Sequence, residues 1–197
     1  EPLWLTRGRL QEGLNWLDAA LGDAGEDAHS GPSARALVSK TLLLAFLGRA
    51  DVLDDAERGL AAARELADPA LLARALAACG VIGAPRDPGL AQQQFAEAAA
   101  IAEELGELPT LAQIRSSEAI SGLIAGEPLA AVRAAQDGLR IARAIGDGFV
   151  ARQCLLSLGW AELLRGDLRD AIAHFDQLAE SATAAEDSMY VLYTQEL

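Results

Sequence analysis

The sequence has very few of the residues on which phosphate binding and catalysis usually depend. Lys40 is the only lysine in a chain with 16 basic residues. The phosphate-binding loop of ATPases, Gly-x4-Gly-Lys-Ser/Thr, needs a lysine with glycines at a fixed spacing, and Lys40 lacks those glycines. ATP hydrolysis by such a loop is therefore excluded within these 197 residues.

Cysteine and histidine are also scarce, with two residues of each. Neither His29 nor His174 has a Cys or His at the spacing of metal ligands, and neither is placed to act as a base for Cys79 or Cys154. We therefore expect no catalytic, cofactor-binding or metal-binding residues, with His174 an ordinary surface histidine and both thiols buried. The two cysteines fall in separate helix pairs, too far apart to form a disulfide, and free thiols favour a cytoplasmic protein.

The chain also lacks an excess of basic residues and a long apolar run. Its formal charge of −13 argues against contact between this segment and nucleic acid or an anionic membrane, because phosphate binding draws its affinity from Lys and Arg. The longest apolar run, Leu42 to Leu47, is far shorter than the roughly 20 residues of a membrane span. We expect a soluble segment that accommodates a basic partner or a neutral ligand.

Small and aliphatic residues are abundant, with 51% hydrophobic content and only 5% aromatic. In residues 155–175 the apolar positions recur three to four apart on both sides of Gly166, which predicts two helices joined by a tight turn. A glycine there can adopt the left-handed conformation that closes a helix, and Asp167 is expected to cap the next helix. Small Gly159 lets the two helices approach, so that Phe175 can reach across.

This helix pair resembles a tetratricopeptide repeat, which has Leu-Gly in its first helix, Gly-Asp in its turn, and Ala followed by an aromatic residue in its second helix. The matching residues are Leu158, Gly159, Gly166, Asp167, Ala171 and Phe175. One such unit buries too little apolar surface to stand alone, so it should have neighbours. The resemblance implies an all-α, right-handed α-solenoid of helix-turn-helix repeats.

A period of about forty residues runs through the chain. It is marked by glycines in the predicted turns, Gly8, Gly48, Gly126 and Gly166, and by similar sequences at the ends of the second helices. The segment from Gly22 to Pro32 is predicted to be a mobile loop. The pattern predicts helices at about 10–21, 33–47, 51–66, 69–83, 88–105, 109–125, 127–145, 148–165 and 167–184.

We expect a single domain over residues 1–197. Its repeats are predicted at about 1–22, 33–67, 69–106, 109–146 and 148–186, with a partial repeat at 187–197. Residues 1–8 read as the tail of a first helix and 188–197 as a first helix without its partner, so we expect the chain to be part of a longer protein. Either absent residues or self-association would cover the apolar face of that last helix.

The first twenty residues narrow the resemblance to one class of repeat protein. They are similar to the segment that follows the nucleotide-binding module in large bacterial signal-transduction ATPases, including LuxR-type transcriptional regulators. The residues that carry this similarity are Gly8-Arg9, Glu12-Gly13, Trp16-Leu17 and Ala20-Leu21. In such proteins the region implies an inducer- or partner-sensing arm between an ATP-binding switch and a DNA-binding output.

The resemblance also implies a binding surface, because the first helices of successive repeats line a concave groove in this fold. The residues at the matching positions are Arg35, Val38, Leu42, Leu76, Gln113, Ser116, Ile120, Gln153, Leu156 and Trp160. This predicted concave face suits a protein or peptide partner or a small inducer, while the second helices are expected to form an acidic outer face. The competing interpretation is that Leu42, Ile120 and Trp160 simply pack between repeats.

The leading functional hypothesis is a non-enzymatic binding and regulatory module, the sensor region of a LuxR-type ATP-dependent transcriptional regulator. The alternative within the same fold is a free-standing scaffold that mediates protein–protein assembly. An enzyme is the third hypothesis, and the sequence offers it no catalytic constellation.

Overall fold

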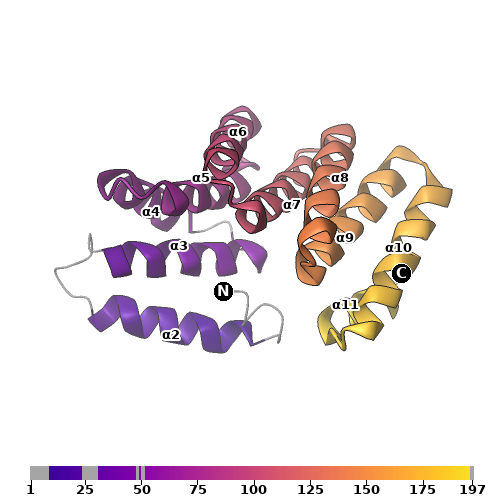
Figure 1. Cartoon of the computed structure of the whole chain (residues 1–197), viewed down its shortest axis with the longest axis horizontal. Coiled ribbons are helices and arrows are strands. Elements are labelled where there is room, and N and C mark those ends of the chain that lie inside the picture. The colour runs from indigo at the N-terminus through magenta and orange to yellow at the C-terminus, as the bar shows by residue number, and fades with distance from the viewer. Residues whose placement is uncertain (1–8, 24–30, 48, 50–51, 196–197) are drawn as a thin grey trace. The chain divides into compact units, whose positions relative to one another are not determined.

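The computed structural model describes residues 9–23, 31–47, 49 and 52–195, and all the regular structure in those ranges is α-helical (Figure 1). This confirms the prediction of an all-α chain of helical repeats. The predictions for residues 1–8 and for most of the loop between Gly22 and Pro32 lie outside the described residues. The described chain divides into two compact units, residues 1–105 and residues 106–197.

The first unit places its hydrophobic core between successive helices. Leu14 and Leu17 of α2 (Leu10–Asp23) pack with Leu43 and Leu44 of α3 (Gly31–Phe46), and all four side chains are buried. Figure 1 shows these two helices side by side. The described helices of the unit are α2 (Leu10–Asp23), α3 (Gly31–Phe46), α4 (Leu53–Glu65), α5 (Pro69–Gly83) and α6 (Pro88–Leu105).

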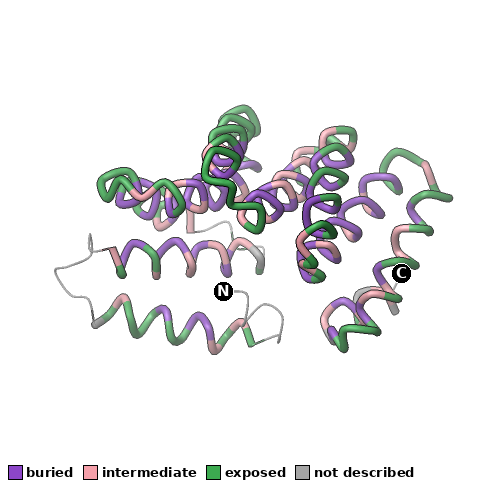
Figure 2. Tube along the Cα trace, in the orientation of Figure 1, coloured by how far each residue is buried: buried purple, intermediate pink, exposed green. Residues whose placement is uncertain are grey.

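In the second unit buried residues lie on both helices of each pair: the second helix 128–145 has at least as many as the first helix 108–124, and only in the next pair does the first helix have clearly more. Figure 2 shows longer buried stretches along the first helix 148–165 than along the second helix that follows it. The described helices are α7 (Leu108–Ile124), α8 (Pro128–Ile145), α9 (Gly148–Arg165), α10 (Leu168–Ala184) and α11 (Ser188–Gln195). From the sequence we expect a single domain over residues 1–197. Whether the two units join into one domain stays a prediction.

The predicted helix boundaries agree with the structure to within two residues. Three helices, 69–83, 88–105 and 148–165, begin and end where the sequence pattern places them. They are well defined because Pro or an Asp-Gly pair starts each one, which leaves little freedom in the first turn. The remaining boundaries differ from the predicted ones by one or two residues, including the starts of α7 and α8, although each of these helices also has a proline in its first turn.

Left-handed residues recur at the turns between helices. Gly166 has a φ of 82°, as predicted, and Gly126 has a φ of 73° at the equivalent turn one repeat earlier. The turns between one helix pair and the next also use this conformation, at Gly106 and Gly146. Four of these turns therefore carry glycine, the residue that adopts a positive φ without steric cost.

Aspartate caps some of the helices that follow these turns. Asp68 accepts a hydrogen bond from the Leu71 amide at 3.1 Å and so caps α5. Asp167 does not cap α10, and that prediction was wrong: its carboxylate instead lies 3.0 Å from the Arg165 guanidinium. A nearby arginine competes successfully for the carboxylate, and the spacing of the turn alone does not reveal this.

Glycines permit close crossings between paired helices. The Phe175 ring lies against Gly159, where an added Cβ would clash with three ring carbons, and Phe95 lies in the same way against Gly80. This confirms the predicted approach of Phe175 across the helix pair. The two crossings lie in different units and use the same pairing of a glycine with a phenylalanine.

Candidate functional site

A polar bridge joins the neighbouring first helices α7 and α9. The Gln113 side-chain amide donates to Gln153 Oε1 at 3.2 Å, and the Ser116 hydroxyl donates to the same oxygen at 3.3 Å. Gln153 and Ser116 are buried, whereas Gln113 is partly exposed. Ser157 donates to the Gln153 carbonyl oxygen one turn earlier on its own helix. The bridge fixes the register of two first helices and brings one amide, that of Gln113, to the surface.

Trp160 lies between the core and the surface. Its ring packs edge-to-face on Phe175, with centroids 5.9 Å apart and an interplanar angle of 78°. The side chain is nevertheless partly exposed, as are Ile120 and Leu156. Trp160 therefore packs against the neighbouring helix and also presents apolar surface, so neither of the two interpretations from the sequence describes it fully. Ile120 and Leu156 present some apolar surface as well.

The apolar surface continues toward the C-terminal ends of the two first helices. Ile124 follows Ile120 by four residues and is 52% exposed, and Leu164 follows Trp160 by four residues and is 62% exposed. Residues four apart lie on the same face of a helix. Ile124 and Leu164 were not among the predicted surface residues, although the same i, i+4 spacing could have identified them.

A buried ion pair fixes α11 to α9. The Arg152 guanidinium lies 2.8 Å from Asp187, and the two side chains are only 8% and 5% exposed. The Arg152 guanidinium also lies 5.9 Å from the Tyr190 ring centroid, and Tyr190 packs edge-to-face on Phe149. A buried charge needs such partners to offset its loss of hydration, and here α11 supplies them. This cluster was not predicted from the sequence.

Arg35 lies at the surface of the first unit and is paired. Its guanidinium donates to the Asp68 carboxylate at 2.8 Å. The hydrogen bond from Arg35, with a further one from the Leu71 amide, holds the pKa of Asp68 below its ordinary value. Arg35 is therefore accessible, but a ligand that binds it must compete with a carboxylate.

The ten residues of the predicted concave face differ in accessibility. Val38, Leu76, Ser116 and Gln153 are buried in the cores of their units and present no surface. Arg35 is exposed, and the residues with intermediate exposure are Leu42, Gln113, Ile120, Leu156 and Trp160. The ten are shared between the two units, so a single face that includes all the accessible ones stays a prediction.

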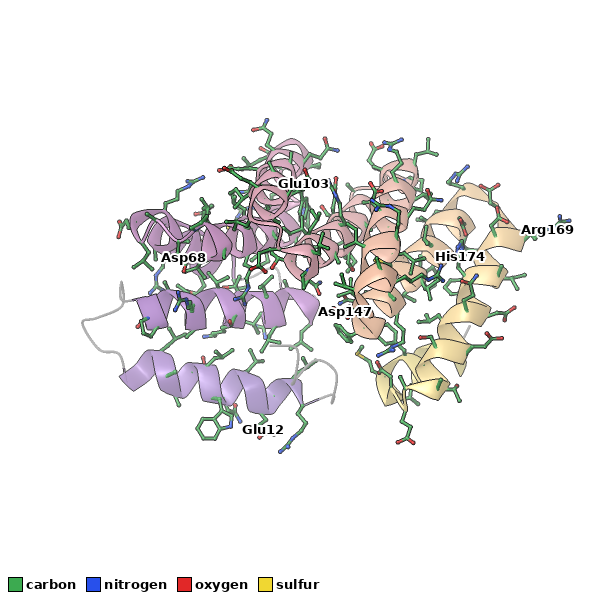
Figure 3. The ribbon with its side chains drawn as sticks, viewed as in Figure 1. Glu12, Asp68, Glu103, Asp147, Arg169 and His174 are labelled. Atoms are coloured by element: carbon green, nitrogen blue, oxygen red, sulfur yellow. The ribbon has the colours of Figure 1, made fainter. Side chains whose placement is uncertain are left out.

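His174 is not an ordinary surface histidine. Its Nδ1 lies 2.6 Å from Glu162 Oε2, and the Glu162 side chain is only 7% exposed. Figure 3 labels His174 on α10, where it meets the carboxylate from α9. The sequence prediction was wrong because a contact between residues twelve positions apart depends on how the two helices pack.

Both thiols are free and buried. Burial raises the pKa of Cys79 and of Cys154 to about 12. A thiol that stays protonated at neutral pH is a poor nucleophile. The burial predicted from the sequence is confirmed.

The predicted acidic outer face does not extend to α8. This second helix carries Arg133, Arg140 and Arg143 against one acidic residue, Asp137. All four side chains are exposed, and Arg140 pairs with Asp137 at 3.3 Å. The net negative charge of the chain therefore does not describe each second helix.

Two further properties concern the described part of the chain. None of its helices combines the length and apolar character that a membrane crossing needs. Within the same residues, His, Cys, Asp and Glu side chains do not gather in groups of three or more that could hold a metal ion.

The sequence is similar to longer proteins from mycobacteria. It is 35% identical, over 206 aligned residues, to proteins of Mycobacterium bovis and Mycobacterium tuberculosis that are named as candidate HTH-type transcriptional regulators. The alignment includes 99% of this chain and 23% of each relative, so the chain corresponds to a limited part of those proteins. No protein-family model matches the sequence.

The fold is similar to that of a solved structure. A crystal structure of Rap protein complexed with competence and sporulation factor matches with a TM-score of 0.83 at 15% sequence identity. The match includes 98% of this chain and 54% of the Rap chain. The chain thus has an all-α, tetratricopeptide-like helical repeat fold, and its sequence is similar to that of proteins named as transcriptional regulators.

Proposed function

We propose that this chain is a non-catalytic regulatory module, the protein- or ligand-sensing region of a LuxR-type, ATP-dependent transcriptional regulator. The similarity to HTH-type regulators along 99% of the chain is the observation that carries the proposal. The aligned part is 23% of each relative, which leaves room in those proteins for nucleotide-binding and DNA-binding modules. The proposal assigns ATP binding to a part of the protein outside this segment, since these residues contain no phosphate-binding loop.

We place recognition on the accessible surface of α7 and α9. Gln113 supplies a hydrogen-bonding amide, and Trp160 with Ile120 and Leu156 supplies partly exposed apolar surface. Aromatic side chains of this kind often dominate binding energy because they bury a large area at low conformational cost. The Rap structure of similar fold was solved as a complex with competence and sporulation factor, which supports a peptide or protein partner for this chain as well. A small inducer is the other ligand class that this surface accommodates.

The first test is the complete reading frame that contains these residues. A regulator requires a nucleotide-binding module and a helix-turn-helix module in the same chain, and the full-length protein should bind ATP and DNA. A reading frame that encodes helical repeats alone would contradict the proposal and favour the free-standing scaffold.

The second test asks whether regulation depends on the proposed surface of α7 and α9. Transcript levels are compared among strains that carry the wild-type gene, a deletion, Trp160→Ala and Gln113→Ala, with Trp16→Ala as the matched control. Trp16 is also exposed, at 64%, but lies on α2 outside the proposed surface. We expect the two surface variants to alter the transcripts that the deletion alters, at unchanged protein level, and the control to behave as wild type. Wild-type transcripts in both surface variants would show that recognition occurs elsewhere.

A further inference from the structure

Two turns between helix pairs hold a residue other than glycine in the left-handed conformation. Ala67 has a φ of 50° and Glu186 a φ of 54°. Among the described residues, Gly106 and Gly146 occupy the equivalent position at the other two such turns. A side chain with a Cβ is less stable in this conformation than glycine, so surrounding contacts must hold these two residues in it.

Each of these two turns is followed by an aspartate that an arginine binds. Asp68 comes directly after Ala67 and pairs with Arg35 at 2.8 Å. Asp187 comes directly after Glu186 and pairs with Arg152 at 2.8 Å. In both cases the arginine is the fifth residue of the preceding first helix, α3 or α9.

The two turns that carry glycine differ at the same helix position. The fifth residues of α5 and α7 are Ala73 and Ala112, and both are buried. Asp147, which follows Gly146, accepts from the Val150 amide at 3.0 Å just as Asp68 accepts from the Leu71 amide, so the capping bond is common to both kinds of turn and the arginine is not (Figure 3 labels Asp68 and Asp147). The strained residue and the arginine therefore occur together at two turns, and the glycine and the alanine occur together at the other two.

We propose that Arg35–Asp68 and Arg152–Asp187 are clasps, each of which holds a strained turn closed and so controls whether the helix after that turn stays docked. The strain favours opening of the turn, and the ion pair opposes it. Local opening is the expected response when the balance of two such contributions changes. Turns with glycine need no clasp because they store no such strain.

The two clasps differ in how easily solvent reaches them. The Arg152 and Asp187 side chains are 8% and 5% exposed, and Tyr190 covers the guanidinium. The Arg35 and Asp68 side chains are 63% and 24% exposed. Salt screens exposed charges much more than buried ones, and an anion in solution can reach Arg35. The Arg35 clasp is therefore the one that an anionic group can release, and the Arg152 clasp should stay closed under the same conditions.

Amide hydrogen exchange in the intact chain tests the proposal at matched positions. The Leu72 amide donates to the Asp68 carbonyl oxygen at 2.9 Å and the Val191 amide to that of Asp187 at 3.0 Å, so each reports on a clasped turn. The Ala151 amide donates to the Asp147 carbonyl oxygen at 3.1 Å and reports on an unclasped turn in the same molecule.

Arg35→Met should lower protection at Leu72 about threefold to fivefold, and Arg152→Met should lower protection at Val191 about tenfold or more, with protection at Ala151 unchanged. A fivefold change corresponds to about 1 kcal/mol, the upper end for an exposed ion pair, and breaking a buried pair costs more. Arg140→Met is the control, because it removes an exposed pairing within α8. Ala67→Gly combined with Arg35→Met should restore most of the protection at Leu72, because glycine removes the strain that the clasp opposes.

Salt provides a second readout without any substitution. Raising ionic strength from about 0.05 M to about 0.5 M shortens the screening length severalfold. Protection at Leu72 should fall in the wild-type chain, with little change at Val191 or Ala151. If Arg152→Met unfolds the second unit, exchange at Val191 no longer tests the proposal. The test then rests on Arg35→Met and on the salt dependence, both read at Leu72 in the first unit. Unchanged protection at Leu72 in Arg35→Met, or no recovery on adding Ala67→Gly, would overturn the proposal.

Discussion

The Phe175 ring fills the space beside Gly159 that a side chain at that position would need. Gly159→Ala should therefore destabilise the protein by about 1–3 kcal/mol, because the added methyl group forces the ring or a helix to shift. Urea unfolding followed by circular dichroism measures this change. Gly22→Ala is the control, since no atom lies within 4 Å of the position of its Cβ, and it should be neutral or slightly stabilising. Equal effects of the two substitutions would show that the crossing is not tightly packed.

The same contact predicts a compensating substitution. Phe175→Leu shortens the side chain where Gly159→Ala lengthens its neighbour, so the double variant should be more stable than the sum of the two single effects predicts. If the changes in the free energy of unfolding are strictly additive in this double-mutant cycle, the two residues do not interact energetically.

The left-handed turns predict that two substitutions increase stability. Glu186→Gly and Ala67→Gly should each raise the free energy of unfolding by about 0.5–1 kcal/mol, because glycine adopts a positive φ without steric cost. Gly146→Ala is the reciprocal variant and should lower it by about 1 kcal/mol or more. Thermal unfolding of the three variants checks the sign of each effect, and a loss of stability in both glycine variants would contradict the assigned strain.

These turns also show how far sequence reasoning extends. The left-handed conformation of Gly166 could be predicted because a glycine turn depends on a local sequence pattern. The boundaries of three helices could be predicted because Pro and Asp fix a helix start within a few residues. The pairing of Asp167 with Arg165 and that of His174 with Glu162 could not be predicted. Both depend on the direction that a side chain takes once the helices have packed.

The candidate binding surface was only partly predictable for a related reason. A tetratricopeptide-like pattern shows which helices are first helices, but adjacent positions on one helix differ by about 100° in direction. Gln153 and Trp160 were assigned to the same face, yet one is buried under α7 and the other is partly exposed. A small rotation of α9 about its axis decides between these outcomes, and that rotation depends on packing across several helices.

The Arg35–Asp68 pair predicts a specific response to acid. Arg35 lowers the pKa of Asp68 from its ordinary value of 3.8, so the folded state binds this proton less readily than the unfolded state does. The pair therefore stabilises the fold above the unfolded-state pKa, and that stabilisation is lost as the pH falls through the lower pKa of the folded state. The contribution should be below about 1 kcal/mol because the pair is partly exposed.

Urea unfolding of the wild type and of Arg35→Met, at neutral pH and across the acidic range, measures this contribution. The two proteins should differ most at neutral pH and converge as the pH falls below 3.8. Arg58→Met removes another exposed pairing, with Asp55, and serves as the control. A difference that stays constant over the whole range would show that Arg35 stabilises the fold by packing and not through the charge of Asp68.

The buried cysteines predict slow reaction with thiol reagents. Because burial raises the pKa of Cys79 and Cys154 to about 12, both remain thiols at pH 8, and the core also shields them. Fewer than about one thiol in a thousand is ionised four pH units below its pKa. The native chain should react with a disulfide reagent only as fast as it opens, and the unfolded chain should react at once at both positions.

The pairing of glycine with phenylalanine at two helix crossings has a consequence for how the sequence can diverge. Gly80 and Phe95 meet in the first unit as Gly159 and Phe175 meet in the second. At each crossing the available volume is shared by two residues, and neither can change size alone without a steric clash or a cavity. Among homologous chains the two positions should therefore covary, with a larger residue at the glycine position accompanied by a smaller one in place of the phenylalanine.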